Sequence, residues 1–181
     1  MRLWWKFYSV SLTHFELFGL KPTFDIDLKV LESNYRKIQS ESHPDRFVTA
    51  SNAEKITSMQ TATIANEAYL TLKSPGLRGA YLLGLSGIVA IDEKNNQMPA
   101  DFLMQQIEWR EMVEDAENAH DISALENLLD DIGVEAKSLQ NTLSNQFKNN
   151  ALAEATDSTR KLIFMDKVRA DIVKSIEKLE D

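Results

Sequence analysis

The sequence predicts an all-α protein, with an N-terminal helical hairpin followed by a C-terminal three-helix bundle. Apolar residues recur at spacings of three and four along the 181 residues, and no convincing run of alternating polar and apolar residues competes with this pattern. Charge also divides the chain. Residues 1–90 hold ten Lys and Arg against eight Asp and Glu, whereas residues 91–181 hold ten against twenty. Such a division indicates two modules with different partners.

Composition excludes several classes of function. The chain has no cysteine, which excludes disulfides, thiolate metal sites and a cysteine nucleophile, and which fits a reducing, cytoplasmic compartment. No stretch approaches the roughly 20 apolar residues that span a bilayer, and the net charge of −8 argues against nucleic-acid binding. His14, His43 and His120 lie in separate segments without ligand-like spacing, so we expect no metal site.

Residues 1–12 are aromatic and basic, and Lys6 interrupts them before an apolar region of signal-peptide length forms. We expect a disordered or loosely packed N-terminal extension here, and the alternative is a weak contact with a membrane interface. A short apolar element follows and is closed by Lys21 and Pro22. Its apolar residues are Phe15, Leu17, Phe18 and Leu20.

Two longer helices come next. Asp25 or Asp27 can cap the first of them. Its expected buried stripe is Leu28, Leu31, Tyr35 and Ile38. A capping box from Ser51 to Glu54 opens the second, which runs to about Lys73. Its apolar residues are Ile56, Met59, Ile64, Ala68 and Leu72.

The tripeptide His43-Pro44-Asp45 lies between these two helices. The proline ends the first helix because it lacks an N–H and its ring clashes with the preceding turn, and it disfavours helical backbone at His43. Two helices of similar length joined by a short loop pack antiparallel. We therefore expect the tripeptide at the exposed tip of a hairpin, where the alternative is an ordinary loop without a function.

Turn-forming residues predict the domain boundary. Gly84, Gly87 and Pro99 fall close together downstream of the second long helix. The expected division is 13–84 for the N-terminal domain, 85–100 for a linker and 101–181 for an acidic helical bundle.

The bundle is expected to hold three helices. The first spans about 100–119, the second opens at a capping box from Ser123 to Glu126, and the third begins near Asn150. The expected buried residues of the second are Leu125, Leu129, Ile132, Ala136, Leu139, Leu143 and Phe147. Those of the third are Leu152, Leu162, Met165, Ile172, Ile176 and Leu179.

The first bundle helix has two apolar sides. One side consists of Phe102, Trp109, Val113 and Ala116. On a helical wheel, Leu103, Met104 and Ile107 project roughly 150° away from it. Glu108, Glu111 and Asp115 extend this second side, which predicts an exposed apolar patch with an acidic rim. Such a patch often binds a partner, and the alternative is that a neighbouring helix or the N-terminal domain covers it.

Further motifs surround the His43-Pro44-Asp45 turn. In order along the chain they are Tyr35-Arg36-Lys37, Asp45-Arg46-Phe47, the stretch from Ile64 to Leu72, and Arg78 with Tyr81. Together with the turn, these motifs resemble a J-domain, the module by which co-chaperones stimulate the ATPase of seventy-kilodalton heat-shock chaperones. The Ser40-Glu41-Ser42 stretch departs from this pattern, since many J-domains are more basic there.

Motifs in the rest of the chain narrow the resemblance. They are residues 14–20, residues 78–83, Phe102-Leu103-Met104 with Glu108 and Arg110-Glu111, and residues 160–167. Over residues 13–181 the chain resembles the HscB family, the bacterial J-type co-chaperones of iron–sulfur cluster assembly. Members of that family normally begin one or two residues before the position of His14, so we expect the first eleven or twelve residues here to be extra.

The resemblance implies a co-chaperone that is not an enzyme and needs no cofactor. Its J-domain would stimulate the ATPase of an HscA-type chaperone, and its bundle would deliver the iron–sulfur scaffold protein IscU to that chaperone. One alternative is a J-protein for a general chaperone with a different client. The other is a small helical enzyme that uses His43 and Asp45, which lack an accompanying catalytic set.

The resemblance also implies two sets of binding residues. On a helical wheel, Lys29, Arg36 and Lys37 lie opposite the buried stripe of their helix. Such a face is usually only solvated, but the J-domain resemblance favours a docking surface for an acidic patch. The chaperone-binding residues are then His43, Pro44, Asp45, Lys29, Arg36 and Lys37. The scaffold-binding residues are Leu103, Met104, Ile107, Glu108, Glu111, Asp115 and Phe164.

Overall fold

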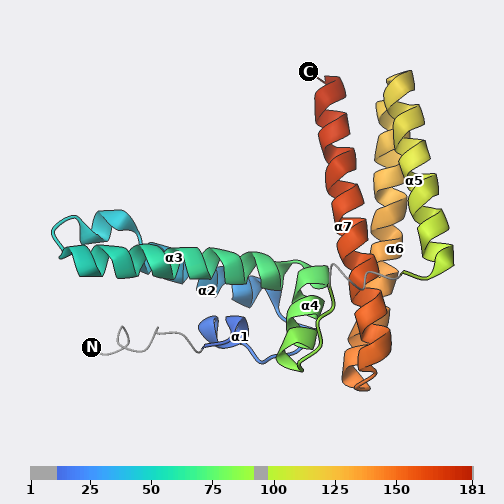
Figure 1. Cartoon of the computed structure of the whole chain (residues 1–181). Coiled ribbons are helices and arrows are strands. Elements are labelled where there is room, and N and C mark those ends of the chain that lie inside the picture. The colour runs from blue at the N-terminus through green and yellow to red at the C-terminus, as the bar shows by residue number, and fades with distance from the viewer. Residues whose placement is uncertain (1–11, 92–97, 181) are drawn as a thin grey trace. The chain divides into compact units, whose positions relative to one another are not determined.

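A computed structural model describes residues 12–91 and 98–180, and within these ranges it contains helices and no strand (Figure 1). The all-α prediction is therefore confirmed. The elements are α1 (His14–Leu17), α2 (Leu28–Glu41), the 3₁₀ turn η2 (Pro44–Phe47), α3 (Asn52–Lys73), α4 (Pro75–Leu85), α5 (Ala100–Ala119), α6 (Ile122–Lys148) and α7 (Leu152–Glu180). Of the predicted N-terminal extension, all but Leu12 lies outside the described residues.

The chain forms two compact units, Met1–Ser74 and Pro75–Asp181. This division falls earlier than the predicted linker at 85–100, part of which lies outside the described residues. From the sequence we predict no helix between Lys73 and the linker, but a proline follows Ser74, and proline is favoured in the first turn of a new helix. Here it begins α4, which packs against α7.

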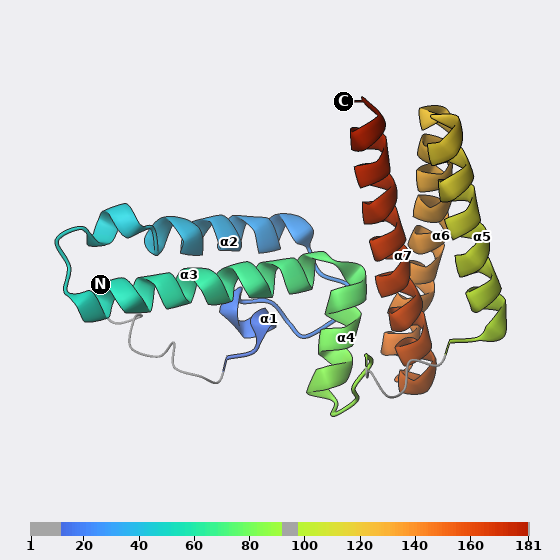
Figure 2. The same cartoon turned by 45° about the horizontal axis from the view of Figure 1, so that its top comes forward.

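In the first unit, α2 and α3 form the expected antiparallel hairpin (Figure 2). The carboxylate of Asp27 caps α2 by accepting a hydrogen bond from the Lys29 N–H at 2.8 Å. Ser51 and Glu54 form the predicted capping box, in which each side chain accepts from the backbone N–H of the other. Local capping chemistry thus sets where both helices begin.

The buried face of α3 differs from the prediction. Ile56, Met59 and Ile64 are exposed, and so is Leu28 on α2. The residues of α3 that are buried are Ser58, Thr61, Ala65, Ala68 and Leu72. Most of these side chains are small, so the backbones of α2 and α3 can approach closely, and larger side chains at these positions would hold them apart.

A polar and aromatic cluster joins α2 to α3; we call its four residues, Tyr35, Gln39, Asn66 and Tyr69, the hairpin clamp. The rings of Tyr35 and Tyr69 stack with centroids 4.1 Å apart and an interplanar angle of 10°. The Tyr35 hydroxyl donates to Asn66 Oδ1 at 2.7 Å, and Gln39 Nε2 donates to the Tyr35 oxygen at 2.7 Å and also to Asn66 Oδ1. These contacts fix the register of the two helices.

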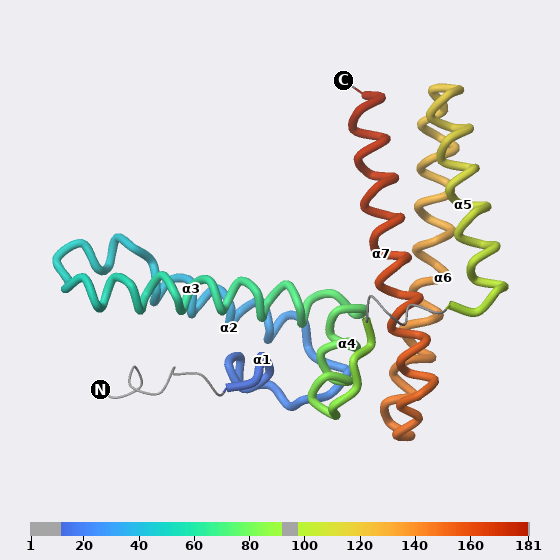
Figure 3. The backbone as a smooth tube through the Cα atoms, in the orientation of Figure 1, coloured from blue at the N-terminus to red at the C-terminus, as the bar shows by residue number. Residues whose placement is uncertain are grey.

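In the second unit, α7 packs against α4, α5 and α6, and Figure 3 shows α5, α6 and α7 running side by side. The expected core positions Leu125, Ile132 and Leu143 of α6 and Leu162 and Met165 of α7 are buried. The predicted capping box at Ser123 is wrong. Asp121 caps α6 by accepting from the Ala124 N–H at 2.9 Å, because the helix begins one residue earlier than Ser123.

Two glycines of α4 lie against other helices of this unit. A Cβ atom on Gly76 would lie 2.8 Å from Ile163 Cγ1 and 3.1 Å from the Ile163 backbone nitrogen. One on Gly79 would lie 2.7 Å from Thr159 Oγ1. The segment after α4 is tied down as well, since Arg160 Nε donates to the Ala90 carbonyl at 2.6 Å. These contacts explain why α4 belongs with the second unit.

We predict that Gly76→Ala lowers the free energy of unfolding by about 1–3 kcal/mol, because the new methyl group would lie 2.8 Å from Ile163 Cγ1 and 3.1 Å from the Ile163 backbone nitrogen. Gly84→Ala is the matched control. Nothing lies within 4 Å of a Cβ at that position, so this change should instead stabilise the helix by about 0.5–1 kcal/mol. Urea unfolding followed by circular dichroism measures both. Equal effects of the two substitutions would contradict the close packing of α4 on α7.

A second prediction concerns pH. Burial lowers the pKa of His14 below its ordinary value of 6.5, and the negative charge of Glu67 opposes this shift. The unfolded chain therefore binds the proton more readily. The stability that neutral His14 contributes is complete above pH 6.5 and is lost as the pH falls through the lowered pKa. An NMR titration should show a His14 pKa below 6.5, and Glu67→Gln should lower it further; a rise in that variant would contradict the assignment.

Candidate functional site

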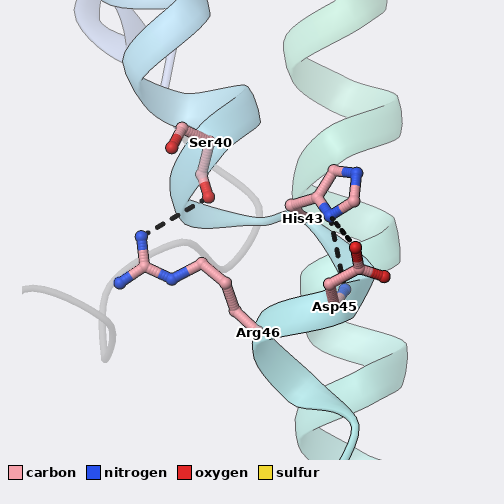
Figure 4. Close-up of polar contacts among 4 residues, drawn as sticks. All are labelled: Ser40, His43, Asp45 and Arg46. Carbon is pink, nitrogen blue, oxygen red and sulfur yellow. Dashed lines mark hydrogen bonds and ion pairs between the residues drawn. The ribbon is translucent and has the colours of Figure 1, made fainter.

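The His43-Pro44-Asp45 turn lies at the tip of the hairpin, as predicted. His43 is extended (φ −63°, ψ 133°), because the proline that follows it disfavours helical backbone, and Pro44 begins the short η2 turn. The side chains of His43 and Asp45 are 59% and 87% exposed. Arg46 closes the turn, since its Nη1 donates to the Ser40 carbonyl at 3.5 Å (Figure 4).

His43 and Asp45 point toward each other (Figure 4). The imidazole Nδ1 accepts a hydrogen bond from the Asp45 backbone N–H at 3.3 Å and lies 3.6 Å from Asp45 Oδ2. Neutral imidazole can accept from the N–H, whereas a proton on Nδ1 would be donated to the carboxylate instead. Both arrangements hold the ring beside Asp45. The turn is therefore a shaped, exposed surface rather than an enclosed catalytic pocket.

The predicted basic residues Lys29, Arg36 and Lys37 are all exposed on α2. At 1.5 Å per residue, Arg36 lies about 10 Å along the helix axis from the tip, and Lys29 about 20 Å. Arg36 forms an ion pair with Glu32 at 2.5 Å. A surface pair at this spacing contributes only about 0.3–0.5 kcal/mol, so a partner carboxylate can replace Glu32 at little cost.

In the second unit, α5 presents the predicted apolar patch. The exposed fractions of Leu103, Met104 and Ile107 are 45%, 62% and 51%. The acidic residues Glu108, Glu111 and Asp115 are exposed beside them. We call these six residues the α5 face. No helix of the second unit covers it, whereas Phe102, Trp109 and Ala116 on the other side of α5 are buried.

Met112 also belongs to this exposed surface, and the sequence interpretation missed it. It is 50% exposed and lies about 40° from Glu108 on a helical wheel. A helical wheel could have revealed it, because Met112 lies between Glu108 of the α5 face and Ala116 on the buried side of α5.

Phe164 on α7 is half-buried. Its ring packs edge-on against Phe102 with centroids 5.8 Å apart, and Phe102 packs in the same way against Trp109 at 6.0 Å. These contacts anchor α5 to α7. Phe164 thus lies at the junction of the two helices, next to the buried side of α5.

Neither a metal cluster nor a membrane-spanning helix is found in the part of the chain that the structure describes. Among residues 12–91 and 98–180, no three His, Asp or Glu side chains gather in a way that could hold a metal ion. None of the helices in the same ranges is long and apolar enough to cross a bilayer. The predicted chaperone-binding residues and the α5 face are exposed, and Phe164 is half-buried. Whether each set binds a partner stays a prediction.

Comparison with known proteins finds relatives that match nearly the whole chain. A family profile described as the HscB C-terminal oligomerisation domain matches residues 98–173. The co-chaperone protein HscB homolog of Ralstonia nicotianae is 44% identical over 174 residues, which cover 96% of this chain and 99% of that protein. The homolog of Burkholderia thailandensis is 42% identical over 95% of this chain and 98% of its own length.

Solved structures agree with the sequence relatives. HscB from Vibrio cholerae superposes with a TM-score of 0.77 at 33% identity, covering 93% of this chain and 99% of that one. Human HscB superposes with a TM-score of 0.79 at 28% identity, covering 90% and 81%. With the exposed His43-Pro44-Asp45 turn and the helical second unit, these similarities show that the chain belongs to the HscB family of J-type co-chaperones of iron–sulfur cluster assembly.

Proposed function

We propose that this chain stimulates the ATPase of an HscA-type heat-shock chaperone and delivers the scaffold protein IscU to it. The exposed His43-Pro44-Asp45 turn supports this proposal most directly. Its two polar side chains are oriented toward each other yet remain open to a partner, since they are 59% and 87% exposed. The chain then acts as an adaptor between two proteins rather than as an enzyme.

At the chaperone end, the J-domain changes the partner by binding one of its states more tightly. A surface that prefers the hydrolysis-competent state of the chaperone shifts the population toward that state without chemistry of its own. Lys29, Arg36 and Lys37 steer the encounter and set the orientation, since exposed charges affect association rates more than affinity. The His43-Pro44-Asp45 turn then makes the contacts that distinguish the two states.

At the scaffold end, the α5 face binds IscU through its apolar centre and acidic rim. Large apolar side chains that are half-exposed, such as Leu103, Met104 and Ile107, gain the most when a partner covers them. Phe164 adds an aromatic edge from α7. Because both surfaces belong to one chain, the bound scaffold reaches the chaperone at a raised effective concentration.

We predict that His43→Gln lowers ATPase stimulation of an HscA-type chaperone on the order of tenfold or more, because the variant loses its discrimination between chaperone states. Steady-state phosphate release measures this, with and without IscU. His120→Gln is the control, since His120 is exposed on the second unit, remote in sequence from the turn. Equal stimulation by both variants would contradict the proposal. Stimulation that ignores IscU would favour a general chaperone with a different client.

We predict that replacing Leu103, Met104 and Ile107 together with alanine weakens IscU binding about tenfold or more. These side chains are not part of the core, so helicity and ATPase stimulation without IscU should stay unchanged. Isothermal titration calorimetry measures the affinity. Val134→Ala is the matched control, because Val134 is 73% exposed on α6 and outside the α5 face. An unchanged affinity in the triple variant would remove the assignment of this surface.

A further inference from the structure

A groove runs along the side of α5 that faces α6. It encloses about 420 Å³. Met104 and Glu108 line it from α5, so it is continuous with the α5 face, and Glu135 and Leu139 line it from α6. Gln105 Nε2 donates to Glu135 Oε2 at 2.8 Å and bridges the two helices at this level. This hydrogen bond joins two residues that are 30 positions apart in the sequence, and it holds α5 and α6 together along the groove.

The walls of this groove combine apolar surface with negative charge. Met104 and Leu139 supply the apolar surface, and Asp101, Glu108 and Glu135 supply three carboxylates. Lys161 is the single cationic side chain in the lining, and its ammonium lies over the Phe102 ring, 5.1 Å from the centroid. The lining therefore carries two more negative than positive charges.

This lining fits one kind of occupant, a lysine or arginine side chain. Such a side chain lays its methylene stem on apolar surface and keeps its charged head beside polar groups. A bare metal ion fits less well, because no cluster of three acidic or histidine side chains in the described part of the chain could hold one. A carboxylate or phosphate ligand would meet like charge.

We propose that the α5–α6 groove receives a lysine or arginine side chain of the scaffold protein. The proposal rests on the proposed binding of IscU to the α5 face and extends that surface onto α6. The α5 face supplies apolar area, and the groove supplies a charge-selective contact beside it. Glu135 is the determinant within the groove, because it is half-buried and belongs to the helix opposite the α5 face.

Glu135→Lys tests the groove, with the full-length chain titrated against IscU at 50 and 300 mM NaCl. At low salt the affinity should fall about tenfold, and the remaining binding should depend less on salt than in the wild type. Glu126→Lys is the matched control. Glu126 is exposed on α6 and points about 180° away from Glu135 at 100° per residue, so its affinity should stay within about twofold.

Two further variants separate charge from structure. Gln105→Ala removes the hydrogen bond to Glu135 but keeps the carboxylate, so IscU affinity should change less than in Glu135→Lys. A set of IscU variants, each with one surface Lys or Arg changed to Glu, should contain one that restores binding to Glu135→Lys. That rescue would identify the side chain that occupies the groove.

The outcomes distinguish this inference from the proposed function. If wild type binds IscU and the triple alanine variant does not, but Glu135→Lys matches Glu126→Lys, the groove is not a contact and the inference is overturned. The same holds if Glu135→Lys changes only self-association, measured by analytical ultracentrifugation. If wild type does not bind IscU at all, the proposed function itself fails.

Discussion

The close packing of α2 on α3 is the constraint on which the J-domain depends. Small residues at Ser58, Thr61, Ala65 and Ala68 let the two helices approach, and the hairpin clamp fixes their register through the Tyr35–Tyr69 stack and the Asn66 hydrogen bonds. Buried Ser42 donates its hydroxyl proton to the Ile38 carbonyl at 2.8 Å and ends α2 immediately before His43. The turn is therefore presented by a rigid support, although its own side chains are exposed.

In the second unit, too, the residues that hold the helices together differ from the residues that are exposed to a partner. α7 is its central helix, and the glycines of α4 bring that helix against it. α5 is anchored through Phe102, which packs between Trp109 and Phe164. Because this anchoring uses the other side of α5, the apolar residues of the α5 face stay about half-exposed. An exposed apolar patch of this kind often marks an interaction site.

Exposed charge on α2 contributes little to the stability of that helix. The ion pair of Arg36 with Glu32 is exposed and contributes a few tenths of a kcal/mol at most, so it neither stabilises α2 greatly nor resists exchange with a partner. Charge instead sets orientation and rate. The distribution of charge is uneven, since residues 1–90 hold ten Lys and Arg against eight Asp and Glu, whereas residues 91–181 hold ten against twenty.

Local chemistry was enough to determine much of this protein from its sequence. The proline of the turn dictated an extended His43, Ser51 and Glu54 dictated the start of α3, and the spacing of Leu103, Met104 and Ile107 dictated an apolar side of α5 opposite its core.

Tertiary structure decided the rest. Periodicity cannot show which of two faces of α3 is buried. Here the face of small residues is buried and Ile56, Met59 and Ile64 are exposed, because small residues allow closer packing. Nor can it show that Pro75 begins a helix of the second unit, or that Gln105 meets Glu135, since both depend on contacts between segments far apart in the chain.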